Sequence, residues 1–248
     1  MACRCRELPR EVTLRPMAVH SRPTVLLTRP RAASERFAQD LQGMEVVIAP
    51  LMEIVATGAD IRLDGISGLI LTSEAAVAAL PTSPLRAYCV GPRTADAARA
   101  AGLLAEELGP NASGLVAQLL ARHTDGTLLH VRGQHQRGDI AARLSAGGIP
   151  TRDVVAYDQR AVDPGPDFRA ALARDALLVP LFSPRSAALF AQAADGLSPA
   201  AELFAMSTAV ADALPDALRR QCRIIPAPNG ADMTRTLNAA AALRRISP

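Results

Sequence analysis

Short apolar runs alternate with amphipathic, often Ala-rich stretches along most of the chain. The apolar runs predict strands at 24–28, 45–49, 67–72, 86–90, 127–131, 149–161, 176–182, 202–206 and 223–226. The stretches between them predict helices at 31–42, 74–80, 93–101, 113–122, 137–146, 185–194, 208–214 and 231–243. Regular alternation of strand and helix predicts an α/β fold with parallel sheets covered by helices.

Segments of the first half of the chain recur in the second half in the same order. The matched pairs are 24–29 with 127–132, 71–77 with 181–187, 94–97 with 210–213, and 110–119 with 228–237. Each match is short, but a shared order is hard to obtain by chance. The chain is therefore predicted to contain two similar lobes.

The repeat leaves open how the two copies pair in space. A tandem arrangement gives lobes at 24–122 and 127–243. In the alternative, the predicted parts are lobe 1 at 23–50 and 163–248, a two-stranded linker at 51–55 and 154–162, and an inserted lobe 2 at 56–153. Residues 1–22 are predicted to be a disordered extension, with Met17 as an alternative start.

Charge and composition exclude several function classes. The net charge is +3, and residues 1–22 alone hold five Arg against two Glu, so the rest of the chain is neutral. Aromatic residues make up 3% and Trp is absent, which argues against a nucleic-acid surface. The sequence contains no Lys, which excludes a Walker phosphate loop and a Schiff-base or pyridoxal enzyme.

Cysteine and histidine usage predicts neither a metal site nor a cofactor. Cys89 and Cys222 lie in apolar contexts and are predicted to be buried, whereas Cys3 and Cys5 lack a second pair for zinc. The four His are not spaced as ligands, and no apolar run is long enough to cross a membrane. We expect a cytoplasmic monomer that uses no metal and no cofactor.

Several predicted strands end in a hydroxyl residue that opens a helix, namely Ser73, Thr94, Ser183 and Ser207. Each hydroxyl has the type and position of an N-cap. Taken together, they also mark the carboxyl edges of parallel sheets, where ligands bind near helix N-termini. If two such edges faced one another, they would form a cleft suited to a polyanionic small molecule.

Arginines near the same strand ends extend this prediction. Arg29, Arg132 and Arg185 can each hold a carboxylate through two parallel hydrogen bonds. The competing interpretation is a solvated surface cation, because Arg is the only long basic residue in this chain.

Tyr157 stands in the predicted linker, and the only other tyrosine, Tyr88, lies in a strand and is expected to be core. A phenol beside a cleft can donate a proton to a leaving group. Interfacial packing is the alternative role for Tyr157.

An ordered set of motifs is similar to the uroporphyrinogen-III synthase family. The motifs are LLTRP at 26–30, ILTSEAAV at 70–77, VGPRTA at 90–95, LHVRG at 129–133, VVAYDQR at 154–160, LFSPRS at 181–186 and AMS at 205–207. The resemblance implies two α/β lobes, the first discontinuous, joined by a two-stranded ladder. It thereby favours the inserted arrangement.

The resemblance also implies a reaction. Hydroxymethylbilane, a linear tetrapyrrole, would lose its terminal hydroxyl as water and close to uroporphyrinogen III with inversion of the last pyrrole, as a step of heme biosynthesis. This lyase would need no cofactor. Tyr157 would assist departure of the hydroxyl, and Ser73, Thr94 and Ser183 would bind substrate carboxylates.

Two departures from the family pattern stand out. Val210 replaces a usual Thr, and Glu74 follows Ser73 where Pro is common. A non-catalytic, two-lobed binding protein or sensor for an anionic small molecule remains the alternative function.

Overall fold

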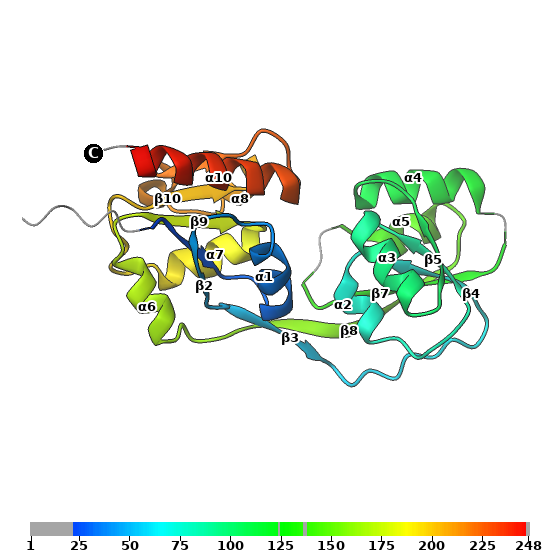
Figure 1. Cartoon of the computed structure of the whole chain (residues 1–248). Helices are drawn as coiled ribbons and strands as arrows, with labels where there is room; N and C mark the ends of the chain where they lie inside the picture. Colours follow the sequence, from blue (N-terminus) through cyan, green and yellow to red (C-terminus); the bar gives the residue numbers. More distant parts are fainter. Residues whose placement is uncertain (1–21, 124, 136–137, 247–248) are drawn as a thin grey trace, which may run out of the picture. The chain divides into compact units, whose positions relative to one another are not determined.

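The computed structural model describes residues 22–123, 125–135 and 138–246, so nearly all of the predicted N-terminal extension lies outside the described residues. The chain forms two compact units (Figure 1). Among the described residues, the first consists of 22–27, Arg36–Ile48 and 166–246. The second consists of Thr28–Glu35 and Ala49–Gly165.

The first unit contains a five-stranded, fully parallel sheet. Its strands in spatial order are β11 (Cys222–Ile224), β10 (Glu202–Ala205), β9 (Leu177–Leu181), β1 (Thr24–Leu27) and β2 (Glu45–Ile48). The accompanying helices are α1 (Arg31–Ala38), α6 (Pro166–Leu172), α7 (Pro184–Ala193), α8 (Thr208–Ala211), α9 (Asp216–Arg219) and α10 (Gly230–Ile246). Strands from both ends of the chain share this sheet, which rules out the tandem arrangement.

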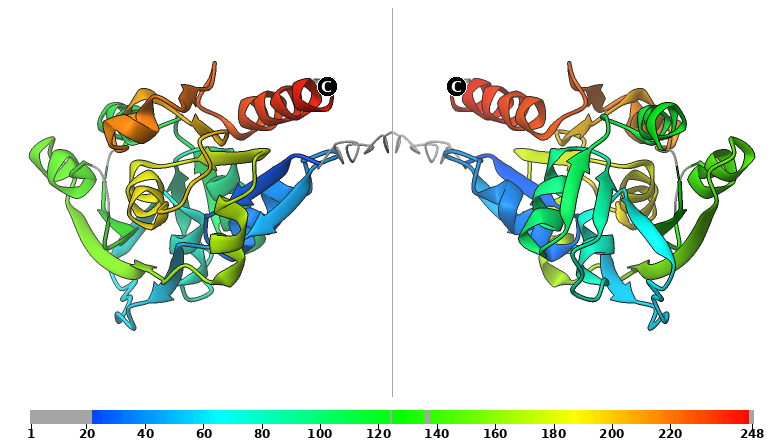
Figure 2. Two further views of the ribbon diagram at one scale, coloured as in Figure 1. Left: turned by 90° about the vertical axis from the view of Figure 1, so that its left-hand side faces the viewer. Right: turned by 90° about the vertical axis from the view of Figure 1, so that its right-hand side faces the viewer.

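Both faces of the first sheet are covered. Phe37 of α1 and Leu237 of α10 pack on Val25 and Phe204 on one face, and α10 appears as an uninterrupted helix in Figure 2. On the other side, helices α6 and α7 meet through Phe168 and Phe190, whose ring centroids are 6.1 Å apart. Burial of such side chains stabilises the fold by about 1.5–3 kcal/mol each.

The second unit contains a six-stranded sheet. In spatial order its strands are β3 (Met52–Ala56), β8 (Thr151–Ala161), β7 (Thr127–Gly133), β4 (Ile66–Leu71), β5 (Arg86–Cys89) and β6 (Leu104–Glu107). Its helices are α2 (Glu74–Ala78), α3 (Pro92–Ala100), α4 (Ala112–Arg122) and α5 (Ile140–Ala146). Apolar residues of α2 and α3 pack on one face, and those of α4 and α5 pack on the other. The prediction of two α/β lobes built on mainly parallel sheets is therefore confirmed.

Strands β3 and β8 form the antiparallel pair that was predicted for the linker. Met52 pairs with Ala161, and Ala56 pairs with Tyr157. Strand β8 runs without interruption over 11 residues and pairs with β7 through its first half. Both strands therefore belong to the second unit, and so does Thr28–Glu35. The prediction had placed the two strands in a separate linker and residues 28–35 in lobe 1.

The sequence pattern did not predict three of the elements. Strand β6 reads Leu-Ala-Glu-Glu and lacks the β-branched residues that mark a strand. Helix α6 begins at Pro166, a residue type that fits the first helical position, but the pattern predicted no helix between the strands at 149–161 and 176–182. Helix α9 has only four residues, too few to show a helical period.

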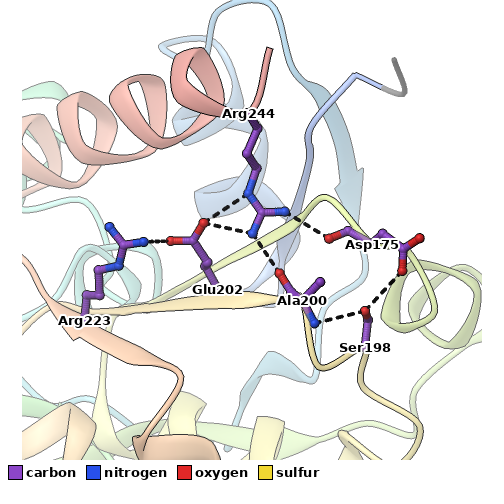
Figure 3. Close-up of polar contacts among 6 residues, drawn as sticks. All are labelled: Asp175, Ser198, Ala200, Glu202, Arg223 and Arg244. Atoms are coloured by element: carbon purple, nitrogen blue, oxygen red, sulfur yellow. Dashed lines mark hydrogen bonds and ion pairs between the residues drawn. The ribbon is translucent and has the colours of Figure 1, made fainter. Parts of the chain in front are cut away.

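Arg244 ties the end of α10 to the sheet of the first unit (Figure 3). Its guanidinium donates to Glu202 Oε1 at 2.8 and 3.0 Å, to the Asp175 carbonyl at 2.9 Å and to the Ala200 carbonyl at 2.7 Å. Arg223 contacts the other oxygen of Glu202, but its side chain is 63% exposed. The two arginines therefore contact the same carboxylate, but Arg223 is far more exposed to solvent than Arg244.

Replacing Arg244 with Met is expected to lower the free energy of unfolding by about 2–3 kcal/mol, because several charge-assisted hydrogen bonds of a side chain that is 21% exposed are lost. Arg223→Met serves as the control and should cost at most about 1 kcal/mol, because water screens an exposed pair. Urea denaturation of both variants measures the difference. Equal losses would show that Arg244 does not anchor α10.

Candidate functional site

A pocket of about 350 Å³ lies at the carboxyl ends of the parallel strands in the second unit. Thr72 and Ser73 follow β4, Val90 follows β5, and Arg132 and Gly133 end β7. Side chains of His130, His135, Tyr157 and Gln159 complete most of the wall. The pocket thus occupies the sheet edge where the sequence predicted ligand binding.

Tyr157 forms part of this wall and rests against Gly133. A Cβ atom on Gly133 would lie 2.7 Å from two carbons of the Tyr157 ring and 3.0 Å from its hydroxyl oxygen. The two residues are register partners on β7 and β8, next to an irregularity between Arg132 and Gly133. Glycine at 133 therefore leaves the space that the ring fills.

The burial of Tyr157 is greater than the sequence predicted. Its side chain is 6% exposed and belongs to a hydrophobic cluster with Ala156, Val131 and residues of α2 and α3. The Tyr157 side chain therefore packs in this cluster and also lines the pocket. Tyr88 is buried in the opposite cluster, as predicted.

A charged group lies beside Tyr157 on the same two strands. His130 Nδ1 is 2.9 Å from Asp153 Oδ1, and Arg132 Nε is 3.4 Å from the same oxygen. Arg132 also donates from Nη1 to the Gly133 carbonyl at 3.2 Å. Asp153 and His130 face each other because they are register partners in the sheet.

Burial determines the direction in which the pKa of His130 is shifted. Desolvation lowers the pKa of His130, outweighing the opposing effect of Asp153. The imidazole is therefore neutral at neutral pH, and the hydrogen on Nδ1 is the one shared with the Asp153 carboxylate. Among the described residues, Nε2 of His130 has no hydrogen-bond partner.

Comparison with known proteins decides the family. A family model described as uroporphyrinogen-III synthase HemD matches residues 35–234, which is most of the chain. The chain belongs to the uroporphyrinogen-III synthase family. Members of this family are lyases.

Solved structures agree with this assignment at the level of the fold. Uroporphyrinogen-III synthetase from Helicobacter pylori 26695 aligns with a TM-score of 0.65 and 16% identity, covering 88% of this chain and 99% of that one. A substituted uroporphyrinogen III synthase from Thermus thermophilus aligns with a TM-score of 0.52 and 14% identity, covering 89% and 99%. No protein with a curated description matches the sequence significantly.

Within this uroporphyrinogen-III synthase fold, Ser73 and Thr94 occupy different settings. Ser73 lines the pocket and caps α2, accepting a hydrogen bond from the Ala75 amide at 3.2 Å. Thr94 was predicted to open its helix, but the cap is Gly91 and Thr94 sits inside α3. Thr94 is 5% exposed and is not part of the pocket wall.

The predicted residues of the first unit gather on one edge of its sheet. Ser183 and Ser207 follow the neighbouring strands β9 and β10. Ser183 caps α7 in a reciprocal pair with Ser186, whereas the Ser207 side chain makes no cap hydrogen bond. Arg185 is half-buried in the first turn of α7.

The sequence analysis also singled out Arg29, Val210 and Glu74. Arg29 is half-buried just after β1, and its carbonyl accepts from the Ser34 hydroxyl at 3.0 Å. Val210, which replaces the family's usual Thr, is 2% exposed in α8. Glu74 is half-buried in the first turn of α2.

The cysteines follow the prediction only in part. Cys89 is fully buried, and desolvation raises the pKa of its thiol to about 11. Cys222 is half-buried rather than buried, because β11 is the edge strand of its sheet. Cys3 and Cys5 lie outside the described residues.

Two kinds of site are absent from the part of the chain that the structure describes. It contains no group of three or more His, Cys, Asp or Glu side chains placed to hold a metal ion. Within the same ranges, no helix combines the length and hydropathy that a membrane span requires.

Sequence reasoning missed His130, Asp153 and Gly133. A signal existed for His130, since a titratable residue in the otherwise apolar run 128–131 has to find a partner when it is buried. Nothing in the sequence pointed to Asp153, because the pairing depends on the register between β7 and β8.

Proposed function

We propose that this chain cyclises hydroxymethylbilane to uroporphyrinogen III, with the second-unit pocket holding the reacting end of the substrate. The observation that carries the proposal is the position of Tyr157, packed on Gly133 in the wall of a pocket that also contains Arg132 and Ser73. A proton donor and a fixed cation are what an anionic substrate with a poor leaving group requires.

Tyr157 acts as the acid that helps the terminal hydroxyl leave as water. The resulting azafulvene is attacked by the substituted carbon of the last pyrrole to give a spiro intermediate. The bond from that carbon to its original methylene then breaks, the methylene bonds to the free α-carbon of the same pyrrole, and this carbon loses its proton to give the inverted ring. The fold supplies the rest by holding the two ends of a flexible bilane close together, a proximity effect worth up to about 7–11 kcal/mol.

The acetate and propionate groups of the substrate are bound by hydroxyl and guanidinium groups at the two sheet edges. In the second unit these are Ser73 and Arg132, which line the pocket. The same role is proposed for Thr94 and Arg29, and for Ser183, Ser207 and Arg185 in the first unit. Capping does not prevent Ser73 from binding, since a hydroxyl oxygen that accepts one hydrogen bond can still donate another. The Ser183 hydroxyl donates to Ser186 Oγ at 3.1 Å, and it would exchange this bond for one to a carboxylate.

We further propose that the protein works as a monomer in the cytoplasm, without metal, cofactor, nucleic acid or membrane. The neutral charge of the chain after residue 22 and the scarcity of aromatic residues support the part of this proposal that concerns nucleic acid.

Isomer analysis tests the proposed reaction. The purified chain is incubated with freshly made hydroxymethylbilane, and the oxidised porphyrins are separated into type I and type III. We expect predominantly type III, whereas spontaneous closure without inversion gives type I. Type I alone, at the rate seen without protein, would overturn the proposal and support an anion-binding protein instead.

A further inference from the structure

Buried His130 pairs with the more exposed Asp153 in an arrangement that the proposed mechanism does not use. The His130 side chain is 1% exposed, that of Arg132 is 19% exposed and that of Asp153 is 34% exposed. Histidine in the middle of an apolar strand costs free energy unless its polar atoms are paired. This makes the group a candidate for a functional role rather than a packing feature.

The contacts show that the role runs through Nδ1. His130 lines the pocket, but its Nε2 is buried and makes no hydrogen bond among the described residues. Nδ1 instead lies 2.9 Å from Asp153 Oδ1, and donation from Nδ1 fixes the carboxylate. Asp153 in turn lies 3.4 Å from Arg132 Nε, as an ion pair rather than an aligned hydrogen bond.

Arg132 is therefore held at two points. Asp153 faces its Nε, and the Gly133 carbonyl accepts from its Nη1 at 3.2 Å. A guanidinium is planar, so one hydrogen bond at Nη1 together with the ion pair at Nε sets the direction of its remaining N–H donors. Because Arg132 lines the pocket, a carboxylate of the ligand can meet those donors without further ordering of the side chain.

We propose that His130 and Asp153 are positioning residues that orient Arg132 to bind a carboxylate of the tetrapyrrole substrate. This inference rests on the proposed function and deepens it. His130 fixes Asp153, Asp153 fixes Arg132, and Arg132 binds the ligand. No proton is transferred within this chain of contacts.

If electrostatic attraction alone determined ligand binding, removing Asp153 would lower KM rather than raise it. Deleting a carboxylate beside Arg132 leaves the pocket more positive and should tighten the binding of an anion. Positioning predicts weaker binding, because Arg132 then has to be ordered each time a ligand arrives. The sign of the change in KM therefore separates the two explanations.

The experiment measures KM and kcat for hydroxymethylbilane in a set of single variants and their combinations. Asp153→Ala should raise KM about tenfold and leave kcat within about threefold, since the chemistry at Tyr157 is untouched. Asp153→Asn keeps an oxygen acceptor for His130 but removes the charge that pairs with Arg132, so it should raise KM nearly as much as Asp153→Ala. Asp96→Ala is the matched control, because it breaks a surface pair with Arg99 on α3 outside the pocket.

A double-mutant cycle supplies the decisive measurement. If Asp153 acts through Arg132, then Asp153→Ala should change KM by less than about twofold in an Arg132→Ala background. His130→Leu, which suits an apolar strand, should raise KM in the same way and keeps the test open if Asp153→Ala fails to fold.

An unchanged or lowered KM in both Asp153→Ala and His130→Leu, with active wild type, would overturn this inference and leave the proposed function intact. Additive effects of Asp153→Ala and Arg132→Ala would overturn it equally. If the wild type makes no type III product, the proposed function fails and this inference falls with it.

Discussion

Replacing Tyr157 with Phe is expected to lower kcat for closure of hydroxymethylbilane about 100-fold or more, the usual contribution of a positioned general acid. Stability should change by less than about 1 kcal/mol, because Phe keeps the ring that packs on Gly133. Among the described residues the Tyr157 hydroxyl has no hydrogen-bond partner, so its removal leaves no other polar group unpaired. A stopped-time assay of bilane consumption together with urea denaturation measures both quantities.

Tyr88→Phe is the matched control for this prediction. Tyr88 is the other tyrosine of the chain and is buried in the second unit, but it does not line the pocket. The control should keep the wild-type rate. Full activity of Tyr157→Phe, or an equal loss in both variants, would remove Tyr157 from the proposed mechanism.

Gly133→Ala is expected to reduce both stability and activity. The added Cβ would lie 2.7 Å from the Tyr157 ring, closer than real Cβ contacts allow, so the ring has to move. Overpacking of this kind costs about 1–3 kcal/mol. A displacement of the acid by about 1 Å can lower the rate about 100-fold. Denaturation curves and kcat measure the two effects separately.

Gly165→Ala provides the comparison, because a Cβ at Gly165 meets nothing within 4 Å. It should leave both the free energy of unfolding and kcat near the wild-type values. If Gly133→Ala behaved like Gly165→Ala, the contact between Tyr157 and Gly133 would not set the position of the phenol.

The sequence predicted the architecture well because its signals are local. Apolar runs such as 177–181 are buried on both sides in a parallel sheet, and their composition shows it directly. Ser73 and Ser183 were recognisable as caps because capping depends only on the next few residues. Strand β6, with its two glutamates at a sheet edge, carries no such signal.

The site was less predictable because it depends on register. Tyr157 was singled out from its place in the linker, but its burial follows from the shift between Arg132 and Gly133, which places the ring on a glycine. The pairing of His130 with Asp153 likewise depends on how β7 and β8 align. Thr94 shows the reverse error, since a hydroxyl near a helix start was taken for a cap that Gly91 provides.

A single-turnover experiment with protein in excess over freshly made hydroxymethylbilane tests the central claim most directly. It follows loss of the bilane and the isomer of the product in the same sample. We expect consumption faster than spontaneous closure, with type III as the main product. Tight binding of the bilane with consumption at the spontaneous rate and only type I product would contradict the claim.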